Sequence, residues 1–206
     1  TYLSTLPNFI IMAPSNQNEL IRMINTSVLI NDRPSAFRYP RGAGEIDNTN
    51  LNYDSLEIGK GIIIKEGNDV AILNLGTRMQ SCEEAIKLLN SHNIYPTLAD
   101  ARFAKPIDKN LIDNLLDHHK YLITIEEGSS GGFGSSVLNY IHNERRKSTL
   151  TKVHNIYFPD RFIDHQSPED QYKEIGMDAD SIANKITKFY QDNIIDFETY
   201  NKNIKN

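Results

Sequence analysis

Short apolar runs and amphipathic stretches alternate along most of the chain. Residues 9–13 are continuously apolar between two prolines, which predicts a strand covered on both faces. Residues 20–28 carry apolar side chains at helical spacing behind Asn16 and Glu19, whose separation is typical of a capping box. Residues 35–37 predict a second strand, so the three segments form a strand–helix–strand unit with parallel strands and a right-handed crossover.

This first unit is too small to be a domain. A parallel sheet needs more than two strands and cover on both faces. We therefore expect the remaining strands to lie upstream of Thr1 or on another polypeptide, and residues 1–42 to depend on that surface. The chain also has no initiating methionine and no signal-like start, so we expect it to be a fragment of a longer protein.

A polar, Asn-rich stretch at residues 43–57 has no period and predicts a linker. Beyond it, predicted strands alternate with predicted helices, which indicates an α/β fold with a doubly wound, mostly parallel sheet and one antiparallel edge strand near residue 58. Glu66-Gly67-Asn68 is a hairpin signal between the first two of these strands. The predicted strands are residues 58–65, 69–75, 95–100, 121–126 and 152–156, and two helices follow near 168–175 and 178–191.

Composition excludes several classes of partner. The formal net charge is -5 and the pI is about 5.7, which argues against a nucleic-acid partner. No apolar run approaches membrane-spanning length, so no membrane partner is expected. The single cysteine, Cys82, excludes an internal disulfide and a Cys-rich metal site, and it lies on the apolar stripe of a predicted helix.

Two arginines follow the strand at residues 35–37. Arg38 stands at its carboxyl end, and Arg41 lies on the turn predicted by Pro40 and Gly42. Ligands of open α/β sheets collect at the carboxyl ends of strands, where two guanidinium groups can bind a phosphate or a carboxylate. The alternative is that both arginines pair with structural carboxylates or with solvent.

Other polar motifs favour structural roles. The glycine-rich loop at residues 128–134 follows a strand and opens a helix, but it matches neither the dinucleotide fingerprint nor the Walker loop. Glu126 and Glu127 are then better explained as acids at a helix N-terminus or an interface than as acid–base groups. The charged segment 100–108 suggests a salt-bridged loop, and no histidine pair has metal-ligand spacing.

The motifs taken together resemble a known family. They are PSAFRYPRG at residues 34–42 and DARFAKPID at 100–108, with shorter motifs at 7–15, 58–61, 71–77, 131–134 and 159–168. In uninterrupted order, over roughly residues 3–190, they resemble the 1-deoxy-D-xylulose 5-phosphate synthases, which are transketolase-like enzymes. The resemblance implies the last part of a pyrimidine-binding domain (1–45), a linker (46–57), a complete transketolase C-terminal domain (58–192), and a tail (193–206) whose composition is compatible with disorder.

The resemblance also implies a reaction. Enzymes of this family use thiamine diphosphate and magnesium to condense pyruvate, with loss of carbon dioxide, and D-glyceraldehyde 3-phosphate. The product, 1-deoxy-D-xylulose 5-phosphate, supplies isoprenoid, thiamine and pyridoxal phosphate synthesis. The family's cofactor, metal and catalytic residues would lie upstream of this chain, so we expect the chain alone to be inactive. Arg38 and Arg41 resemble the arginines that hold a substrate anion, and the implied partners are the upstream domains and a second copy in a homodimer.

Two other classes remain open at this stage. The β subunit of a 2-oxo acid dehydrogenase shares the architecture, but is not expected to combine the two long motifs. A non-catalytic interaction module would use the C-terminal fold alone. The Asn, Ile and Lys content suggests an AT-biased genome, which implies a plastid of the apicoplast type in a eukaryote or the cytoplasm of a bacterium.

Overall fold

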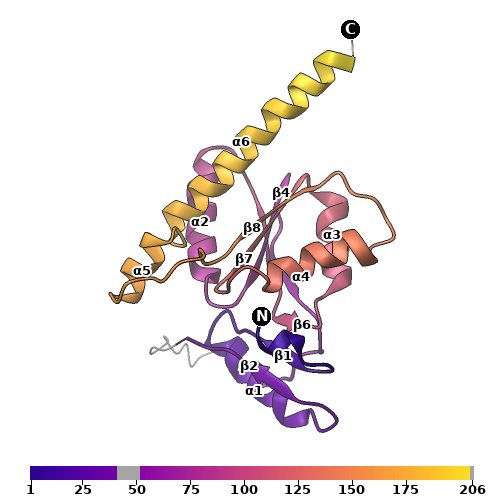
Figure 1. Ribbon diagram of the computed structural model, residues 1–206, viewed down its shortest axis with the longest axis vertical. Coiled ribbons are helices and arrows are strands. Elements are labelled where there is room, and N and C mark those ends of the chain that lie inside the picture. The colour runs from indigo at the N-terminus through magenta and orange to yellow at the C-terminus, as the bar shows by residue number, and fades with distance from the viewer. Residues whose placement is uncertain (41–51, 205–206) are drawn as a thin grey trace.

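The computed structural model describes residues 1–40 and 52–204, with side chains as far as residue 193. The described strands form a five-stranded sheet in the order β3-β5-β4-β7-β8 and a three-stranded sheet in the order β2-β1-β6 (Figure 1). The strands are β1 (Ile10–Met12), β2 (Ser35–Phe37), β3 (Ile62–Lys65), β4 (Val70–Leu75), β5 (Thr97–Asp100), β6 (Phe103–Lys105), β7 (Tyr121–Glu126) and β8 (Lys152–Ile156). The helices are α1 (Gln17–Leu29), α2 (Met79–Ser91), α3 (Lys109–His118), α4 (Phe133–Asn139), α5 (Pro168–Glu174) and α6 (Ala179–Ile204), with short helices η1 (Leu3–Thr5) and η2 (Tyr140–Glu144).

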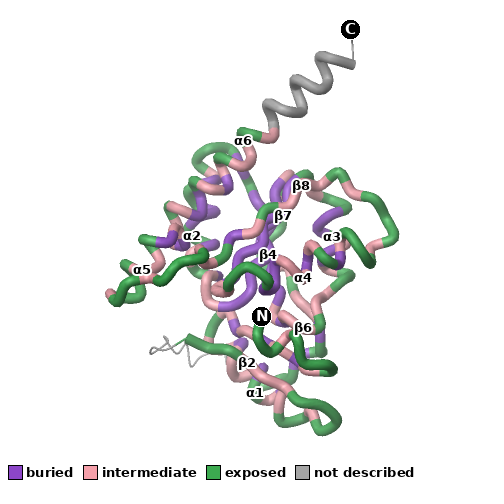
Figure 2. Tube along the Cα trace, viewed as in Figure 1, coloured by how far each residue is buried: buried purple, intermediate pink, exposed green. Residues whose placement is uncertain are grey.

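Helices cover both faces of the five-stranded sheet. Side chains of α2 and α6 pack on one face, and side chains of α3 and α4 pack on the other. Buried residues gather along the central strands β4 and β7, which are buried at every position (Figure 2). Strands β4, β5, β7 and β8 are parallel, and β3 is antiparallel at the edge. The predicted doubly wound, mostly parallel sheet with an antiparallel edge strand is confirmed.

The predicted hairpin at residues 66–68 is wrong. Strand β3 pairs with β5, and β5 lies between β3 and β4. The reason lies at Gly67, where a Cβ atom would stand 2.2 Å from the carbonyl oxygen of Tyr95. Asn68 donates its backbone N–H to the same oxygen at 2.6 Å. Residues 67 and 68 therefore pack against the backbone just before β5, and β3 and β4 do not form a hairpin.

The three-stranded sheet contains the predicted strand–helix–strand unit. Strands β1 and β2 are parallel, and the side chain of Asn16 caps α1 by accepting the N–H of Glu19 at 2.9 Å. The third strand is β6, which pairs antiparallel with β1. The expectation that the missing strands lie upstream or on another polypeptide is therefore wrong for this strand. It comes from the segment at residues 100–108, which we expected to be a salt-bridged loop.

Phe103 anchors β6, the segment that follows β5, in the core formed by the three-stranded sheet and α1. Its side chain is fully buried at the start of β6, immediately after the chain leaves the five-stranded sheet at β5. Burial of a phenylalanine removes a large apolar surface from water and is a major contribution to a small core. The other buried members of its cluster come from the first part of the chain and are Ile10, Met12, Met23 and Leu56.

An ion pair joins the same two parts of the chain beside Phe103. Arg102 adopts a left-handed backbone conformation with φ of 57°, and its carbonyl oxygen accepts the N–H of Ala13 at 2.9 Å. Its guanidinium contacts the carboxylate of Glu19 on α1 through two N–O distances of 2.7 Å. One of these contacts is a hydrogen bond between opposite charges, which is stronger than a neutral one. The two sheets are thus held in one relative orientation.

Part of the predicted linker at residues 46–57 packs on α1. Its first residues, to residue 51, lie outside the described residues. Leu56 is buried, and its backbone N–H donates to the hydroxyl of Thr26 at 2.7 Å. The N–H of Asn52 donates to the side chain of Asn18 at 2.8 Å. The second half of this segment therefore packs against the first lobe, which consists of the three-stranded sheet and α1.

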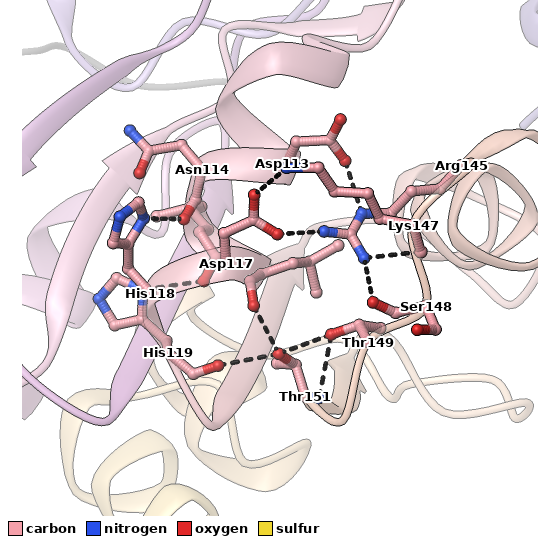
Figure 3. A network of polar contacts seen from close by, with 12 residues as sticks. Asp113, Asn114, Asp117, His118, His119, Arg145, Lys147, Ser148, Thr149 and Thr151 are labelled. Carbon is pink, nitrogen blue, oxygen red and sulfur yellow. Dashed lines mark hydrogen bonds and ion pairs between the residues drawn. The ribbon is translucent and has the colours of Figure 1, made fainter.

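Arg145 is the centre of a network of polar contacts between α3 and the segment that precedes β8 (Figure 3). Its side chain is only 1% exposed. It donates to Asp113 at 2.7 Å and also binds Asp117, both on α3. Its other bonds go to backbone oxygens of Lys147 and Ser148. The cluster joins the end of α3 to the chain entering β8, so we assign it a structural role.

The last helix is longer than its sequence pattern predicts. Helix α6 continues past the predicted end at residue 191 to Ile204, and it projects from the body of the molecule (Figure 1). The tail whose composition is compatible with disorder is thus helical over most of its length. Within the described residues, no helix combines the length and hydropathy that a membrane span requires.

The position of Phe103 predicts a large loss of stability on truncation. Phe103→Ala should lower the free energy of unfolding by roughly 3–5 kcal/mol, because it leaves a cavity in the core that β6 forms with β1 and α1. Phe162→Ala is the control, since Phe162 is 100% exposed and its loss should change stability by less than about 0.5 kcal/mol. Urea unfolding of both variants measures the difference. Equal stabilities would contradict the packing described here.

Candidate functional site

The carboxyl ends of β2, β4 and β7 converge on one cavity. It encloses about 130 Å³, and its lining includes Arg38 after β2, Thr77 after β4, Glu127 after β7 and Phe133 at the start of α4. Ligand sites of open α/β sheets lie at such ends. The cavity is bounded by the three-stranded sheet on one side and the five-stranded sheet on the other. It therefore lies at the boundary between the two predicted domains.

Glu127 is the most heavily contacted acidic group in this cavity. Its side chain is 8% exposed, and Oε1 accepts from the hydroxyl of Thr77 at 2.6 Å and from Nε of Arg78 at 2.8 Å. Thr77 and Arg78 lie between the end of β4 and the start of α2. Two donors on one oxygen compensate the burial of the negative charge. Oε2 is left facing the first sheet.

Arg78 is itself held in place by Tyr172. The guanidinium carbon lies 3.4 Å from the centroid of the Tyr172 ring, which is a close cation–π contact. Burial raises the pKa of the Tyr172 hydroxyl, and the neighbouring Glu127 carboxylate raises it further. Tyr172 therefore stays protonated and fixes one side of Arg78. The helices α2 and α5 both contribute to the setting of Glu127.

Arg38 lies at the end of β2 as the sequence predicts, and it contacts Glu127. It donates to the backbone oxygen of Glu127, and its second terminal nitrogen lies 3.5 Å from Oε2. The Arg38 side chain is 61% exposed, so much of the guanidinium faces the open side of the cavity. The pairing with a structural carboxylate that we held open is thus present. Arg41, the other predicted arginine, lies outside the described residues.

Glu126 has a different role from its neighbour. Its carboxylate accepts the backbone N–H groups of Phe133 and Gly134 at 2.9 and 2.8 Å, at the N-terminus of α4. A Cβ atom at Gly128 or Gly132 would lie 2.4 Å from this carboxylate. The glycine-rich loop is therefore wrapped around an internal anion, and these N–H groups are engaged. This confirms the structural interpretation of the loop and of Glu126.

Asp100 is a buried acid at the end of β5. It is 1% exposed, and Oδ1 accepts the backbone N–H of Arg102 at 2.9 Å. Burial raises the pKa of Asp100 to about 6, although the hydroxyl of Ser15 and the N–H of Arg102 lower it. The nearby Glu19 carboxylate raises this pKa as well. The connection between the two sheets therefore contains a group that titrates near neutral pH.

The described residues do not fit a cofactor or metal site. No group of three His, Cys, Asp or Glu side chains among them is arranged to hold a metal ion. The N–H groups of Phe133 and Gly134, where a phosphate might bind, are occupied by Glu126. Burial raises the pKa of the Cys82 thiol to about 12, so this cysteine is an inert core residue as predicted. What the cavity offers chemically is an exposed guanidinium group for an anion.

Sequence reasoning missed Thr77, Arg78 and Tyr172. Thr77 follows a predicted strand, so its place at a carboxyl end was a usable signal. Tyr172 lies almost a hundred residues away from Arg78, and only the packing of α5 near the start of α2 brings the two side chains together. No local pattern in the sequence could have found that contact.

Comparisons with known proteins agree with this fold. The family model described as "Transketolase, C-terminal domain" matches residues 59–182. The chain is 45% identical over 184 residues to "Probable 1-deoxy-D-xylulose-5-phosphate synthase 2, chloroplastic" of Oryza sativa subsp. japonica. It is 47% identical over 186 residues to "1-deoxy-D-xylulose-5-phosphate synthase 1, chloroplastic" of Cannabis sativa. The matches cover 88% and 89% of this chain but only 26% of each relative.

A solved structure extends the likeness to both sheets. The chain is similar to "Split gene transketolase, inactive beta4 tetramer", with a TM-score of 0.77 and 26% sequence identity. The similarity covers 89% of this chain and 58% of that one. Since the family match spans residues 59–182, the structural similarity extends beyond it.

The buried Asp100 predicts a pH-dependent stability. An unfolded aspartate has a pKa near 3.9, so between about pH 4 and pH 6 the folded state keeps a proton that the unfolded state has lost. The wild type should therefore lose up to about 3 kcal/mol of stability relative to Asp100→Asn across this range, with no further change above about pH 7. Chemical denaturation at a series of pH values measures this difference.

Asp32→Asn provides the control for this titration. Asp32 is an exposed carboxylate beside Arg33, which lowers its pKa, so its removal should give only a small dependence of opposite sign. A stability difference between wild type and Asp100→Asn that stays constant from pH 4 to 7 would show that Asp100 does not titrate in this range.

Proposed function

The chain belongs to the transketolase C-terminal domain family, and we propose that it is the C-terminal part of a 1-deoxy-D-xylulose 5-phosphate synthase. Such an enzyme would condense pyruvate, with loss of carbon dioxide, and D-glyceraldehyde 3-phosphate. The observation that carries the proposal is 45–47% identity to named synthases over nearly nine-tenths of the chain. The chain spans about a quarter of the length of these relatives, so the activity is proposed for a longer parent protein.

In this proposal the parent's other domains supply the cofactor chemistry. Thiamine diphosphate would stabilise the carbanion formed from pyruvate, and magnesium would hold its diphosphate. Their ligands would come from parts of the parent that this chain does not contain, since its described residues do not fit them. The chain's own contribution would be to bind and orient a substrate anion at the cavity between the two sheets.

The first lobe offers a surface on which the rest of the parent can pack. Among the strands that the structure describes, β2 lies at the edge of its sheet and pairs with β1 alone. On α1, Ile24, Val28 and Leu29 are 41%, 71% and 66% exposed, an uncommon concentration of apolar side chains on one short helix. We infer that these groups contact the remainder of a pyrimidine-binding domain whose last part is residues 1–45. A homodimer of the parent, and a plastid location in a eukaryotic source, are part of the same proposal.

Arg38 and Arg41 are the proposed anion-binding residues. Support for Arg38 comes from its place at the end of β2 and from the exposure of its side chain beside the cavity. A guanidinium group has five N–H donors, and two of its nitrogens contact Glu127, so donors remain for a phosphate or carboxylate. Arg41 is proposed from the sequence motif that both arginines share.

The cofactor assignment predicts that the isolated chain does not bind thiamine diphosphate. Isothermal titration of thiamine diphosphate with magnesium into the 206-residue chain should give no binding heat, whereas the full-length parent should bind and form the product. Micromolar affinity in the isolated chain would contradict the assignment of cofactor binding to other domains. Absence of condensation by the full-length parent would contradict the proposed function itself.

Substitution of the arginines tests the anion site in the full-length parent. Arg38→Ala or Arg41→Ala should lower kcat/KM for the affected substrate on the order of 10- to 200-fold, because a hydrogen bond to a charged group contributes about 1.5–3 kcal/mol. Lysine at the same position should restore part of the activity, since it keeps the charge without the planar fork. The substrate that suffers identifies the anion.

Arg33→Ala is the matched control for these variants. Arg33 precedes β2, is exposed, and pairs with Asp32 away from the cavity, so its removal should leave kcat/KM unchanged. An unphosphorylated aldehyde acceptor should be insensitive to the substitutions if phosphate is the ligand. An Arg38→Ala enzyme with normal kinetics and lowered thermal stability would show that the pair with Glu127 is purely structural.

A further inference from the structure

Glu127 differs from the other carboxylates of the cavity in having one oxygen fixed and one directed at an exposed arginine. Oε1 is bound by Thr77 and Arg78, while Oε2 and the backbone oxygen of the same residue face Arg38. Within the described part of the chain, both side-chain hydrogen bonds of Arg38 go to this one residue. The orientation of the guanidinium therefore depends on Glu127.

We propose that Glu127 is a positioning residue, which holds the Arg38 guanidinium in the orientation that receives the substrate anion. This inference rests on the proposed function of Arg38. A long arginine side chain that is 61% exposed has many rotamers, and restricting them before binding lowers the entropy lost when the anion arrives. Glu127 would not touch the substrate itself.

The fixed half of the carboxylate makes this positioning effective. Thr77 and Arg78 come from the five-stranded sheet's side of the cavity, whereas Arg38 comes from the three-stranded sheet. Arg78 is in turn stacked on Tyr172 at 3.4 Å. Thr77 and Arg78 thus fix the position of the Glu127 carboxylate, and its free oxygen, Oε2, orients the guanidinium of Arg38 from the other sheet. Site geometry would then depend on how the two domains are joined.

The contacts also define a substitution that removes one interaction and keeps the rest. In Glu127→Gln the amide oxygen can still accept from Thr77 and Arg78. The amide nitrogen then replaces Oε2, and two donors face each other where a charged contact stood at 3.5 Å. Glu174→Gln is the matched control, because Glu174 on α5 pairs with Arg161 at 2.6 Å and lies outside the cavity lining.

A double-mutant cycle in the full-length enzyme tests the proposal. We expect Glu127→Gln to raise KM for the substrate that Arg38→Ala affects by about 3- to 10-fold and to change kcat by less than about twofold, because an exposed pair is screened by water. Combined with Arg38→Ala, Glu127→Gln should add nothing further. Glu174→Gln should leave both constants unchanged. Multiplicative effects of Arg38→Ala and Glu127→Gln, or an unchanged KM in Glu127→Gln, would overturn the proposal.

A second readout separates this proposal from the proposed function. In the 15N-labelled chain, the side-chain Nε–H signal of Arg38 is identified by its loss in Arg38→Lys. In Glu127→Gln, the chemical shift of this signal should approach that of an exposed arginine such as Arg146. Addition of inorganic phosphate should then change the chemical shift of Arg38 less than it does in the wild type. An Arg38 signal insensitive to Glu127→Gln overturns the positioning role even if the enzyme is active. Lack of condensation by the wild type overturns the function alone.

Discussion

The pairing of β6 with β1 is the constraint on which the rest of the structure depends. Shortly after β5, the chain leaves the five-stranded sheet, and the three residues of β6 become the third strand of the other sheet. Phe103 buries its ring in the first lobe, and Arg102 forms an ion pair and a hydrogen bond with Glu19. Hydrogen bonds, apolar burial and charge therefore act on the same few residues, so the carboxyl ends of β2, β4 and β7 meet at one cavity.

The two adjacent glutamates at the end of β7, Glu126 and Glu127, have different structural roles. Successive residues at the end of a strand point to opposite sides. Glu126 turns toward α4 and neutralises the N-terminus of that helix, which the glycines of the loop allow. Glu127 turns toward the start of α2 and toward Arg38. The first carboxylate completes the junction of β7 with α4, and the second connects the two sheets at the candidate site.

Local pattern predicted most elements and some of the site. Apolar runs and the capping pair Asn16 and Glu19 identified β1 and α1, and the strand ending at Arg38 placed that arginine correctly. Long-range pairing was not predictable. The sequence around β3 predicts a hairpin, and only the close contact of Gly67 with the backbone of Tyr95 shows why none forms. The charged residues of segment 100–108 predict a loop, although the segment contains strand β6. Tyr172 joins the site only through packing of distant helices.

The central claim is that β6 unites the two sheets. Amide hydrogen exchange of the whole chain tests this claim most directly. The N–H of Ala13 donates to Arg102 across the joint, and the N–H of Arg38 donates to Met12 within the first sheet. If the joint is part of the cooperative fold, both amides exchange slowly and with the same opening free energy as those of β4. Unprotected exchange at Ala13, with β4 still protected, would show that the sheets are not united and would contradict the account.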